Sequence, residues 1–392
     1  MGIAVPDALG RERRMAATAE VTYGTFVKPA TTSMMKALMS KFSYKQGRKT
    51  REDARQTRSP QQRITGKKEC TWSSEHYIAP RAAGTAPDVG PMLKHALGVE
   101  TVNASTSVVY TLTRTQGLQG SLSLAHEFSE VVMEALKGAW VQTVKISISG
   151  GNEPRISFEG GAADHVQTGY STAASISNSN TVVVTAADQD LFEVDSIVAV
   201  GAQTDRKVTA KTANSLTVDG AAITATTPVV KPWIPADTYA LDDSGNTGGD
   251  ALAEIDGTLT LTDSGSIIAE TTPKITAFEL NITNNFKPIN NEAFQDKVTD
   301  IIEGYRSITG SITIRARRDW IKLWASRKRF VTTDLFVRVG PASGRRMEID
   351  LNQIEIEFGD LDIPQEEEGL FTLPFLALGT LAGEDECTIS FK

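Results

Sequence analysis

The sequence predicts a mainly β protein, built as an antiparallel β-sandwich or barrel with one or two flanking α-helices and a small inserted β-barrel domain. Thr, Val, Ser and Ile are abundant, they fall in short runs of alternating apolar and polar residues, and turn residues separate the runs. A period of two places one face of a strand in the core and the other in solvent. The clearest runs carry their apolar residues at Val108, Tyr110 and Leu112; at Val144, Ile146 and Ile148; at Phe278, Leu280 and Ile282; and at Ile308, Ile312 and Ile314.

Two segments show helical rather than strand periodicity. From Leu122 to Lys137 the apolar residues recur at every third or fourth position, which predicts a helix that stops at Gly138. A second helix is expected from Arg318 to Arg329, with two tryptophans and a leucine on its core face. Both helices are expected to flank the β-sheets.

Changes in composition predict how the chain divides. A length of 392 residues suggests two or three domains. A connector rich in Ser, Thr, Ala and Asn opens a segment of closely spaced short β runs, which we interpret as a small barrel inserted into the larger domain, with its two ends close together. The expected units are an N-terminal arm at 1–19, the two halves of the main domain at 20–169 and 236–392, and the insert at 170–235.

Basic charge is concentrated in one segment, although the net charge of the chain is −8. Residues 41–68 include ten basic and two acidic side chains, so this segment carries +8 and the remainder −16. It could be a solvated charge run, a nucleic-acid-binding arm, or an arm that docks on an acidic surface of another copy. Few aromatic side chains are available for base stacking, so charge complementarity favours the inter-subunit arm. Its candidate contact residues are Arg48, Lys49, Arg51, Arg55, Arg58 and Arg63.

Acidic charge is concentrated near the C-terminus. Residues 348–368 include nine acidic side chains and no basic one. The apolar residues of this region alternate up to Leu351 and resume one position out of phase at Ile354, so we place a β-bulge near Gln353. The candidate acidic surface for the arm consists of Glu348, Asp350, Glu355 and Glu357.

The motifs of common catalytic and metal sites are incomplete here. Gly66-Lys67 lacks the rest of a phosphate-binding loop, and the HEFSE sequence from His126 to Glu130 lacks the second histidine of a zinc helix. The stretch from Asp242 to Asp250 lacks the ligand spacing of a calcium loop, which favours a solvated turn. We therefore expect a protein that is not an enzyme and has no catalytic residues, metal or cofactor.

Composition also excludes several protein classes. Cys70 and Cys387 are too few for a disulfide-built secreted scaffold and are expected to be inert core thiols in a reducing cytoplasm. A net charge of −8 argues against a basic nucleic-acid binder. The longest strongly apolar stretch, 370–383, is shorter than the ~20 residues of a membrane helix, so no membrane contact is expected.

Three short motifs stand in a characteristic order after an early strand at 20–28, a long arm and the sequence GKKECTW at 66–72. They are G-A-x-V at 138–141, S-F-E-G-G at 157–161 and R-x-I-T-G-S at 306–311. This order resembles the tail tube protein, or major tail protein, of long-tailed, non-contractile bacteriophages (siphophages). The resemblance covers about 20–169 and 251–392 and leaves out the insert.

The resemblance implies a structural subunit of the virion tail that is assembled in the cytoplasm of the bacterial host. Such proteins form stacked hexameric rings, and strands from six subunits close one barrel around a channel for genome ejection. The implied partners are further copies of the chain, the tape measure protein, and the tail terminator and tail-tip proteins. DNA passes transiently without specific binding, which suits an acidic chain. The alternative is a tail-tip or host-binding β-rich virion protein, which would form a single ring or trimer; a β-solenoid hydrolase is disfavoured because no internal repeat is present.

Overall fold

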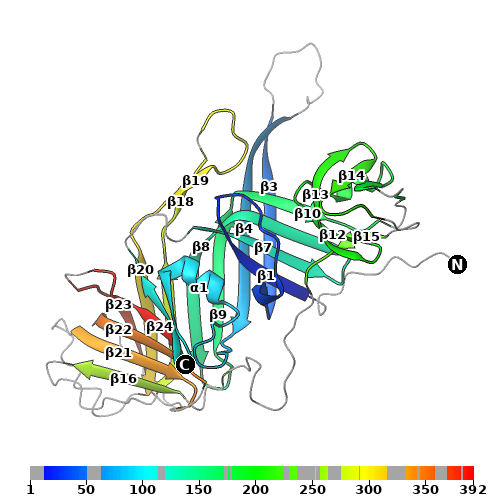
Figure 1. The fold of residues 1–392 in the computed structure, drawn as a ribbon. Helices are drawn as coiled ribbons and strands as arrows, with labels where there is room; N and C mark the ends of the chain where they lie inside the picture. Colours follow the sequence, from blue (N-terminus) through cyan, green and yellow to red (C-terminus); the bar gives the residue numbers. More distant parts are fainter. Residues whose placement is uncertain are drawn as a thin grey trace.

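The structure is a computed structural model that describes residues 13–50, 63–113, 120–171, 175–176, 179–223, 229–235, 252, 257–263, 275–290, 292–315, 332–341, 345–357, 369–380 and 383–392. Over these residues the protein is mainly β, with antiparallel pairing between its strands (Figure 1). The main assembly contains β1 (Arg13–Glu20), β2 (Met34–Met35), β3 (Met39–Lys49), β4 (Ile64–Tyr77), β5 (Gly98–Asn103), β6 (Ser107–Leu112), β7 (Ser121–Phe128), β8 (Val132–Ser149), β9 (Arg155–Ala162), β10 (Asp164–Thr168), β16 (Thr258–Asp263), β17 (Ile275–Thr283), β20 (Ser307–Arg315), β21 (Thr332–Val339), β22 (Met347–Ile356), β23 (Leu370–Ala377) and β24 (Thr388–Phe391).

Two smaller sheets and a helix complete the described fold. A five-stranded sheet contains β11 (Thr181–Val183), β12 (Ile197–Val200), β13 (Gln203–Thr212), β14 (Ser215–Val218) and β15 (Val230–Pro232). A projecting ribbon contains β18 (Lys287–Ile289) and β19 (Asp300–Ile302). The helix α1 (Gly90–Leu97) packs against β8, β5 and β6. Short 3-10 turns lie at Thr31–Ser33 and Gln189–Leu191.

The long strand β8 connects the two parts of the main assembly. Its first part pairs with β7 and β10, and its second part, from Trp140 onward, pairs with β9 and β17. Gly138 lies between these parts with a φ of 62°, a left-handed conformation that favours glycine. The second part belongs to the continuous strand order β3-β4-β9-β8-β17-β20-β23.

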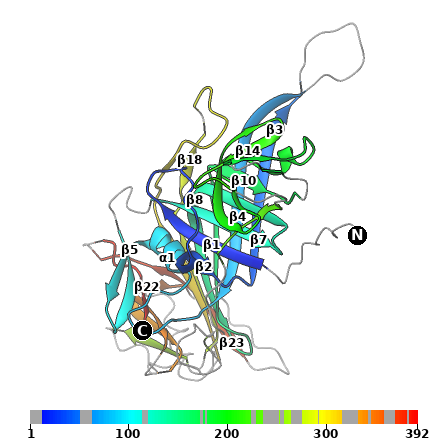
Figure 2. The same cartoon turned by 45° about the vertical axis from the view of Figure 1, so that its right-hand side comes forward.

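The core lies between that sheet and a second layer. One edge of β22 pairs with β24 near the start of β22 and with β23 near its end. From the other edge of β22 the sheet continues to β21 and then β16. Beyond β24 it continues to β6 and then β5. Figures 1 and 2 show these strands and α1 packed against one face of the β8–β20 region. Apolar side chains from both layers and from α1 form one buried cluster, which removes most of the apolar surface from water.

Three of the sequence motifs meet at a single point in this fold. The indole nitrogen of Trp72 donates a hydrogen bond to the carbonyl oxygen of Gly161 at 3.1 Å. A Cβ atom on Gly161 would lie 2.2 Å from the ring of Trp140, and one on Gly160 would lie 1.8 Å from the carbonyl oxygen of Trp140. Glycine is therefore required at both positions, because β8 and β9 approach too closely for a side chain.

The structure confirms the strand alternation and the bulge. Tyr110, Ile146, Leu280 and Ile312 are each fully buried on their strands. On β22 the partner of Thr333 is Ile354, whereas the partner of Leu335 is Leu351, so β22 contains one extra residue between these pairs. The bulge at Asn352 and Gln353 explains why the apolar residues change phase there.

The predicted helix from Leu122 to Lys137 is wrong. These residues form the hairpin of β7 and β8, whose turn places Ser129 and Glu130 at φ values of 51° and 58° and bonds the amide of Val131 to the carbonyl of Phe128 at 3.0 Å. Two positive φ values are typical of a type I′ hairpin turn. The helical spacing arose because it combined apolar residues of two strands, Leu124 and Phe128 before the turn and those from Val131 to Leu136 after it. β7 pairs along its edges with β1 and β8, and its two faces pack in two different apolar clusters.

Two further expectations concern the termini of elements. The early strand lies at Arg13–Glu20 rather than at 20–28, because its alanines and Met15 pair along the whole of β7. Residues 13–19 therefore belong to the sheet and are not part of an arm. The second predicted helix, 318–329, lies outside the described residues, as does the glycine-rich loop 242–250.

The five-stranded sheet lies within the segment 170–235 and has its own apolar core, which includes Val198, Val208 and Val230. It also packs on the main assembly. Ile197 and Ile234 join a cluster with Met133 and Val166 of β8 and β10. The segment is therefore fixed against the sheet by apolar contacts as well as by its chain connections.

Candidate assembly surfaces

The histidine of the HEFSE sequence is part of a structural cluster. His126, on β7, contacts the Glu134 carboxylate through Nε2 at 2.8 Å and the Ser40 hydroxyl through Nδ1 at 3.1 Å, and its ring stacks on Phe42 at 3.9 Å. His165 contacts the same carboxylate at 3.5 Å. Hydrogen bonds from the two histidines lower the pKa of Glu134 to about 2. The cluster ties β3, β7, β8 and β10 together.

The described ranges contain no group of three or more His, Cys, Asp or Glu side chains arranged to hold a metal ion. No helix within them is long and apolar enough to cross a membrane. Cys70 and Cys387 are both buried free thiols, and burial raises the pKa of each to about 12. Thiols in this state are poor nucleophiles at neutral pH.

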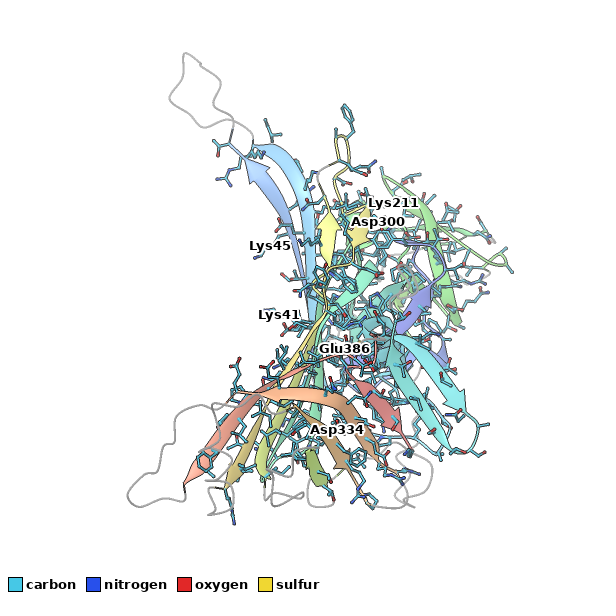
Figure 3. All side chains as sticks on the ribbon, turned by 90° about the vertical axis from the view of Figure 1, so that its left-hand side faces the viewer. Lys41, Lys45, Lys211, Asp300, Asp334 and Glu386 are labelled. Carbon is cyan, nitrogen blue, oxygen red and sulfur yellow. The ribbon has the colours of Figure 1, made fainter. Side chains whose placement is uncertain are left out.

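The basic segment forms a long hairpin that extends away from the body (Figures 1 and 3). Strand β3 carries Lys41, Lys45, Arg48 and Lys49, and Arg63 precedes β4. All five are exposed or nearly so. Of the other predicted contact residues, Arg51, Arg55 and Arg58 lie outside the described residues. We call the paired part, 39–49 with 63–77, the basic hairpin.

The stem of the basic hairpin already has acidic partners in its own chain. The Lys68 ammonium lies 3.2 Å from Asp164 and 3.3 Å from Asp296. The Lys68 amide also donates to the carbonyl of Asp296 at 2.7 Å, and the Lys67 ammonium donates to the carbonyl of Glu292 at 3.2 Å. The stem is thus held against β10 and the loop between β18 and β19.

The predicted acidic surface lies on β22, at the opposite end of the molecule from the tip of the basic hairpin (Figure 3). Glu348 contacts Arg346 at 2.7 Å and also pairs with Lys392. Asp350 is exposed, and its pKa is raised by partial burial and by the nearby Asp334 and Glu348 carboxylates. Within one chain the structure does not bring the basic hairpin and β22 together.

Across the bulge, Glu355 and Glu357 lie at the end of β22 that pairs with β23. Glu355 is half-buried and Glu357 is exposed. The extra residue near Gln353 keeps them on the same face of β22 as Glu348 and Asp350, because the alternate residues on both sides of the bulge, including Leu351 and Ile354, are buried. The four predicted carboxylates therefore share the face of β22 that points away from the core, with the bulge between the two pairs.

One face of the central sheet is lined with small polar side chains. A single row across the strands reads Glu75, Ser157, Lys145, Asn281 and Thr309 from β4 to β20. Side chains on this face are exposed or half-buried, while the alternate residues lie in the core. We call this the polar sheet face. Its residues are Ser73, Glu75, Thr143, Lys145, Ser147, Arg155, Ser157, Glu159, Glu279, Asn281, Thr283, Ser307, Thr309, Ser311, Thr313 and Thr372.

The charges of the polar sheet face largely neutralise one another. Lys145 lies 2.8 Å from Glu279, and Arg155 lies 3.2 Å from Glu75. Hydrogen bonds from Lys145 and Asn281 lower the pKa of Glu279, so this carboxylate is ionised at neutral pH. Such half-exposed pairs add little stability, about 0–1 kcal/mol each. Their effect is to leave a face of hydroxyl groups with little net charge.

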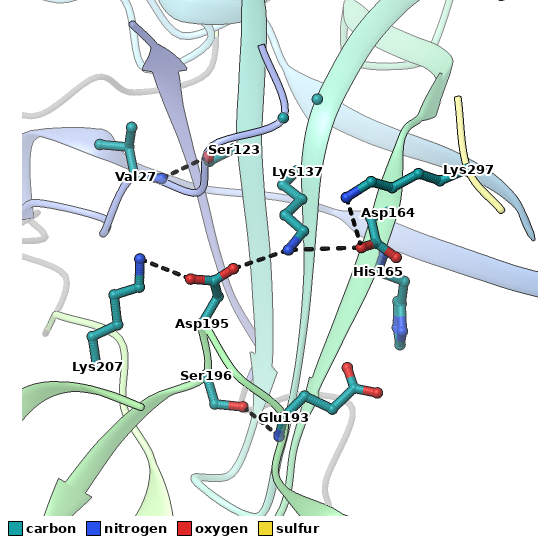
Figure 4. A network of polar contacts seen from close by, with 12 residues as sticks. Val27, Ser123, Lys137, Asp164, His165, Glu193, Asp195, Ser196, Lys207 and Lys297 are labelled. Carbon is teal, nitrogen blue, oxygen red and sulfur yellow. Dashed lines mark hydrogen bonds and ion pairs between the residues drawn. The ribbon is translucent and has the colours of Figure 1, made fainter. Parts of the chain in front are cut away.

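A chain of ion pairs connects the five-stranded sheet to the main assembly (Figure 4). Asp195 accepts contacts from Lys207 at 2.8 Å and from Lys137 at 2.9 Å, and Lys137 also lies 3.6 Å from Asp164. Lys297 contacts Asp164 at 3.7 Å. The network therefore runs from β13 through β8 to the loop between β18 and β19.

Sequence analysis missed two features of these surfaces. The β18–β19 ribbon was not expected, because each of its strands has only three residues, too few to show a periodic pattern. The His126–Glu134–His165 cluster brings together strands that are distant in sequence. No protein-family model matches the chain, and no curated protein does.

Proposed function

We propose that the chain is a structural tail tube subunit of a siphophage virion, which forms hexameric rings that stack around a central channel for genome ejection. The observation that carries this proposal is the polar sheet face. From β4 to β20 it presents mainly hydroxyl groups with paired charges, and it continues onto β23 with Thr372 and the exposed Leu370 and Leu376. A channel wall of this kind offers few sites to which phosphate groups could bind, so DNA could slide past it.

The edge of the same sheet supports assembly from several copies. Within the described residues β3 pairs with β4 alone, so its other edge has main-chain groups available for another strand. If the sheets of neighbouring subunits join edge to edge, they close a barrel and remove the exposed edges. The polar sheet face would then line the lumen, around the tape measure protein and later the DNA.

Charge placement supports stacking between rings. The basic hairpin and the carboxylates of β22 lie at opposite ends of one chain, so they can meet only between copies. A contact between two different surfaces of identical subunits repeats head to tail and generates rings or filaments. The tail terminator and tail-tip proteins would end such a filament, and the protein would be located in the virion tail after assembly in the host cytoplasm.

Negative-stain electron microscopy of the purified protein at high concentration, with sedimentation velocity over a concentration series, tests this proposal. Rings and tubes with a central channel are the expected result. A protein that stays monomeric at all concentrations, including after a tail initiator complex is added, contradicts it. Single rings or trimers that never stack would favour the tail-tip or host-binding alternative.

A further inference from the structure

An exposed aromatic side chain lies at the tip of the β18–β19 ribbon. Phe294 is fully exposed, with a relative accessibility of 106%, and its backbone has a φ of 67°. A large side chain seldom adopts this left-handed conformation, and an exposed phenyl ring gains nothing from burial in its own chain. The left-handed backbone and the exposed phenyl ring are therefore both unfavourable, and no contact within the described fold offsets them.

The same tip is held firmly in place. The amide of Lys68 donates to the carbonyl of Asp296 at 2.7 Å, the Lys68 ammonium contacts the Asp296 carboxylate at 3.3 Å, and Lys67 donates to the carbonyl of Glu292 at 3.2 Å. These contacts flank Phe294 on both sides. The chain on either side of Phe294 is thus held before any partner arrives, which lowers the entropy cost of binding.

A pocket suited to such a ring opens at the other end of the same ribbon. It has a volume of about 530 Å³, and its apolar lining includes Tyr23, Phe286 and Ile301. Val21 and Ile302 also line it, with relative accessibilities of 98% and 54%. An exposed apolar rim around a preformed pocket is typical of an interaction site. We call this the Tyr23 pocket.

Most polar groups of the Tyr23 pocket are already paired within the chain. Both Glu20 oxygens accept two hydrogen bonds each, from the hydroxyls of Ser121 and Ser123 and the amides of Gly24 and Gly138. His95 contacts the Gly120 carbonyl through Nε2 at 2.9 Å and accepts from the Val141 amide through Nδ1 at 3.3 Å. The hydroxyl of Tyr23 is buried and has no hydrogen-bond partner among the described residues. An incoming segment needs to supply one polar group to the Tyr23 hydroxyl and apolar surface to Val21, Phe286 and Ile301, which line the pocket together with the side chains of Asp300 and Glu303.

We propose that Phe294 of one copy inserts into the Tyr23 pocket of the next copy, and that the main chain beside Phe294 pairs with the Tyr23 hydroxyl. The occupant is a second copy because ring and pocket lie at opposite ends of one ribbon and cannot meet in a single chain. Between them β18 and β19 are paired from Lys287 with Ile302 to Ile289 with Asp300, so the ribbon does not fold Phe294 back onto the pocket at its base. The contact joins two different surfaces, so it repeats from copy to copy. This inference rests on the proposed function and names a contact that would join its subunits.

Assembly of Phe294→Ala, followed by sedimentation velocity, tests the contact. The expected result is a rise of at least about 30-fold in the protein concentration needed for assembly, since a buried aromatic anchor is the kind of residue that dominates an interface. Ile302→Glu, which places a charge on the pocket wall, should have a similar effect. The double variant should need no higher a protein concentration for assembly than the more impaired of the two single variants, because both substitutions remove the same contact. Val183→Ala removes another exposed apolar side chain, on β11, and should assemble as the unchanged protein does.

Photo-crosslinking from p-benzoylphenylalanine at position 294 gives an independent measurement. Peptide mapping should find crosslinks to residues 20–23 or 300–303 of another copy. Assemblies that form normally in Phe294→Ala, or crosslinks that map elsewhere, overturn this inference and leave the proposed function standing. Dimers crosslinked through position 294 that never form rings support the contact and contradict the proposed function. A monomer at every concentration contradicts both.

Discussion

Lys137 and Asp195 form an ion pair of 2.9 Å that joins the long central strand to the five-stranded sheet of the segment 170–235. Partial burial alone would raise the pKa of Asp195, but its contacts with Lys207 and Lys137 outweigh that effect and leave the pKa below its usual value. Beside this pair, Ile197 and Ile234 pack into the cluster of Met133 and Val166. Deletion of the whole segment would expose that cluster, so the position of the segment in an assembly is better tested by labelling than by deletion.

We expect a bulky label on the outside of the segment 170–235 to leave assembly intact. Val183 is 42% exposed on β11, so Val183→Cys should react with a maleimide-polyethylene glycol reagent, whereas the two native thiols are buried. Tubes seen by electron microscopy should still form. The matched variant Thr309→Cys places the same label on the polar sheet face, where it should block the channel and ring closure. Loss of tubes with the label at 183 would place this segment in a subunit contact.

Removal of charge from the basic hairpin should separate ring formation from stacking. We expect the combined replacement of Arg48, Lys49, Arg51, Arg55 and Arg58 by Ser to give rings that no longer stack. Each exposed pair contributes only about 0–1 kcal/mol, but contacts repeated around a ring add together. Stacking of the unchanged protein should weaken with salt, because charges are screened within ~8 Å at physiological ionic strength.

Two double variants that each remove two exposed basic side chains test whether the effect is specific to the basic hairpin. The double variant Arg48→Ser and Lys49→Ser should weaken stacking, whereas replacing the exposed Lys94 and Lys287 by Ser should not. Light scattering over a salt series measures both. Unchanged tubes with unchanged salt dependence would show that the charge of the hairpin is incidental, and a change in DNA passage alone would favour the nucleic-acid interpretation.

Glu127 should make the folded state less stable as the pH rises towards neutrality. Its side chain is fully buried, and burial raises the pKa from 4.5 to about 7, although Arg14, at 3.1 Å, opposes this shift. Between these two pH values the folded state keeps a proton that the unfolded state has released. Stability is therefore lost across this window, by up to about 3 kcal/mol, and is constant above it.

Glu127→Gln removes this titration while retaining an oxygen that can accept from Arg14. We expect the variant to be more stable than the unchanged protein at pH 8 and equally stable near pH 4.5. Urea unfolding at four pH values from 4.5 to 8 measures the difference. If the free energy of unfolding changed with pH in the same way in both proteins, Glu127 would not be the group whose titration lowers stability.

Gly160→Ala should destabilise the junction of β8 and β9. A Cβ atom at this position would lie 1.8 Å from the main-chain oxygen of Trp140, so the backbone itself has to move. We expect the free energy of unfolding to fall by about 1–3 kcal/mol. Gly47→Ala provides the control, because the nearest atom to its Cβ would be 3.7 Å away. Equal stability of the two variants by thermal unfolding would contradict this role of Gly160.

The β class, the alternating core positions and the bulge followed from local sequence. A strand with one wet face has a period of two, so Tyr110, Ile146 and Leu280 could be assigned to the core without knowledge of their partners. The change of phase between Leu351 and Ile354 likewise identified an extra residue within a single strand. These features depend on contacts that each strand makes with water on one side and apolar groups on the other.

Tertiary structure decided what local sequence could not. The residues from Leu122 to Lys137 have an apolar spacing that fits a helix, but their main chain pairs with β1 and β8 and both faces of β7 pack in apolar clusters, which makes it a strand. The meeting of Trp72, Trp140 and Gly161, the Lys137–Asp195 pair and the separation of Phe294 from the Tyr23 pocket each join segments that are distant in sequence. Composition and periodicity fix which residues avoid water, whereas the folded chain alone fixes which distant residues meet.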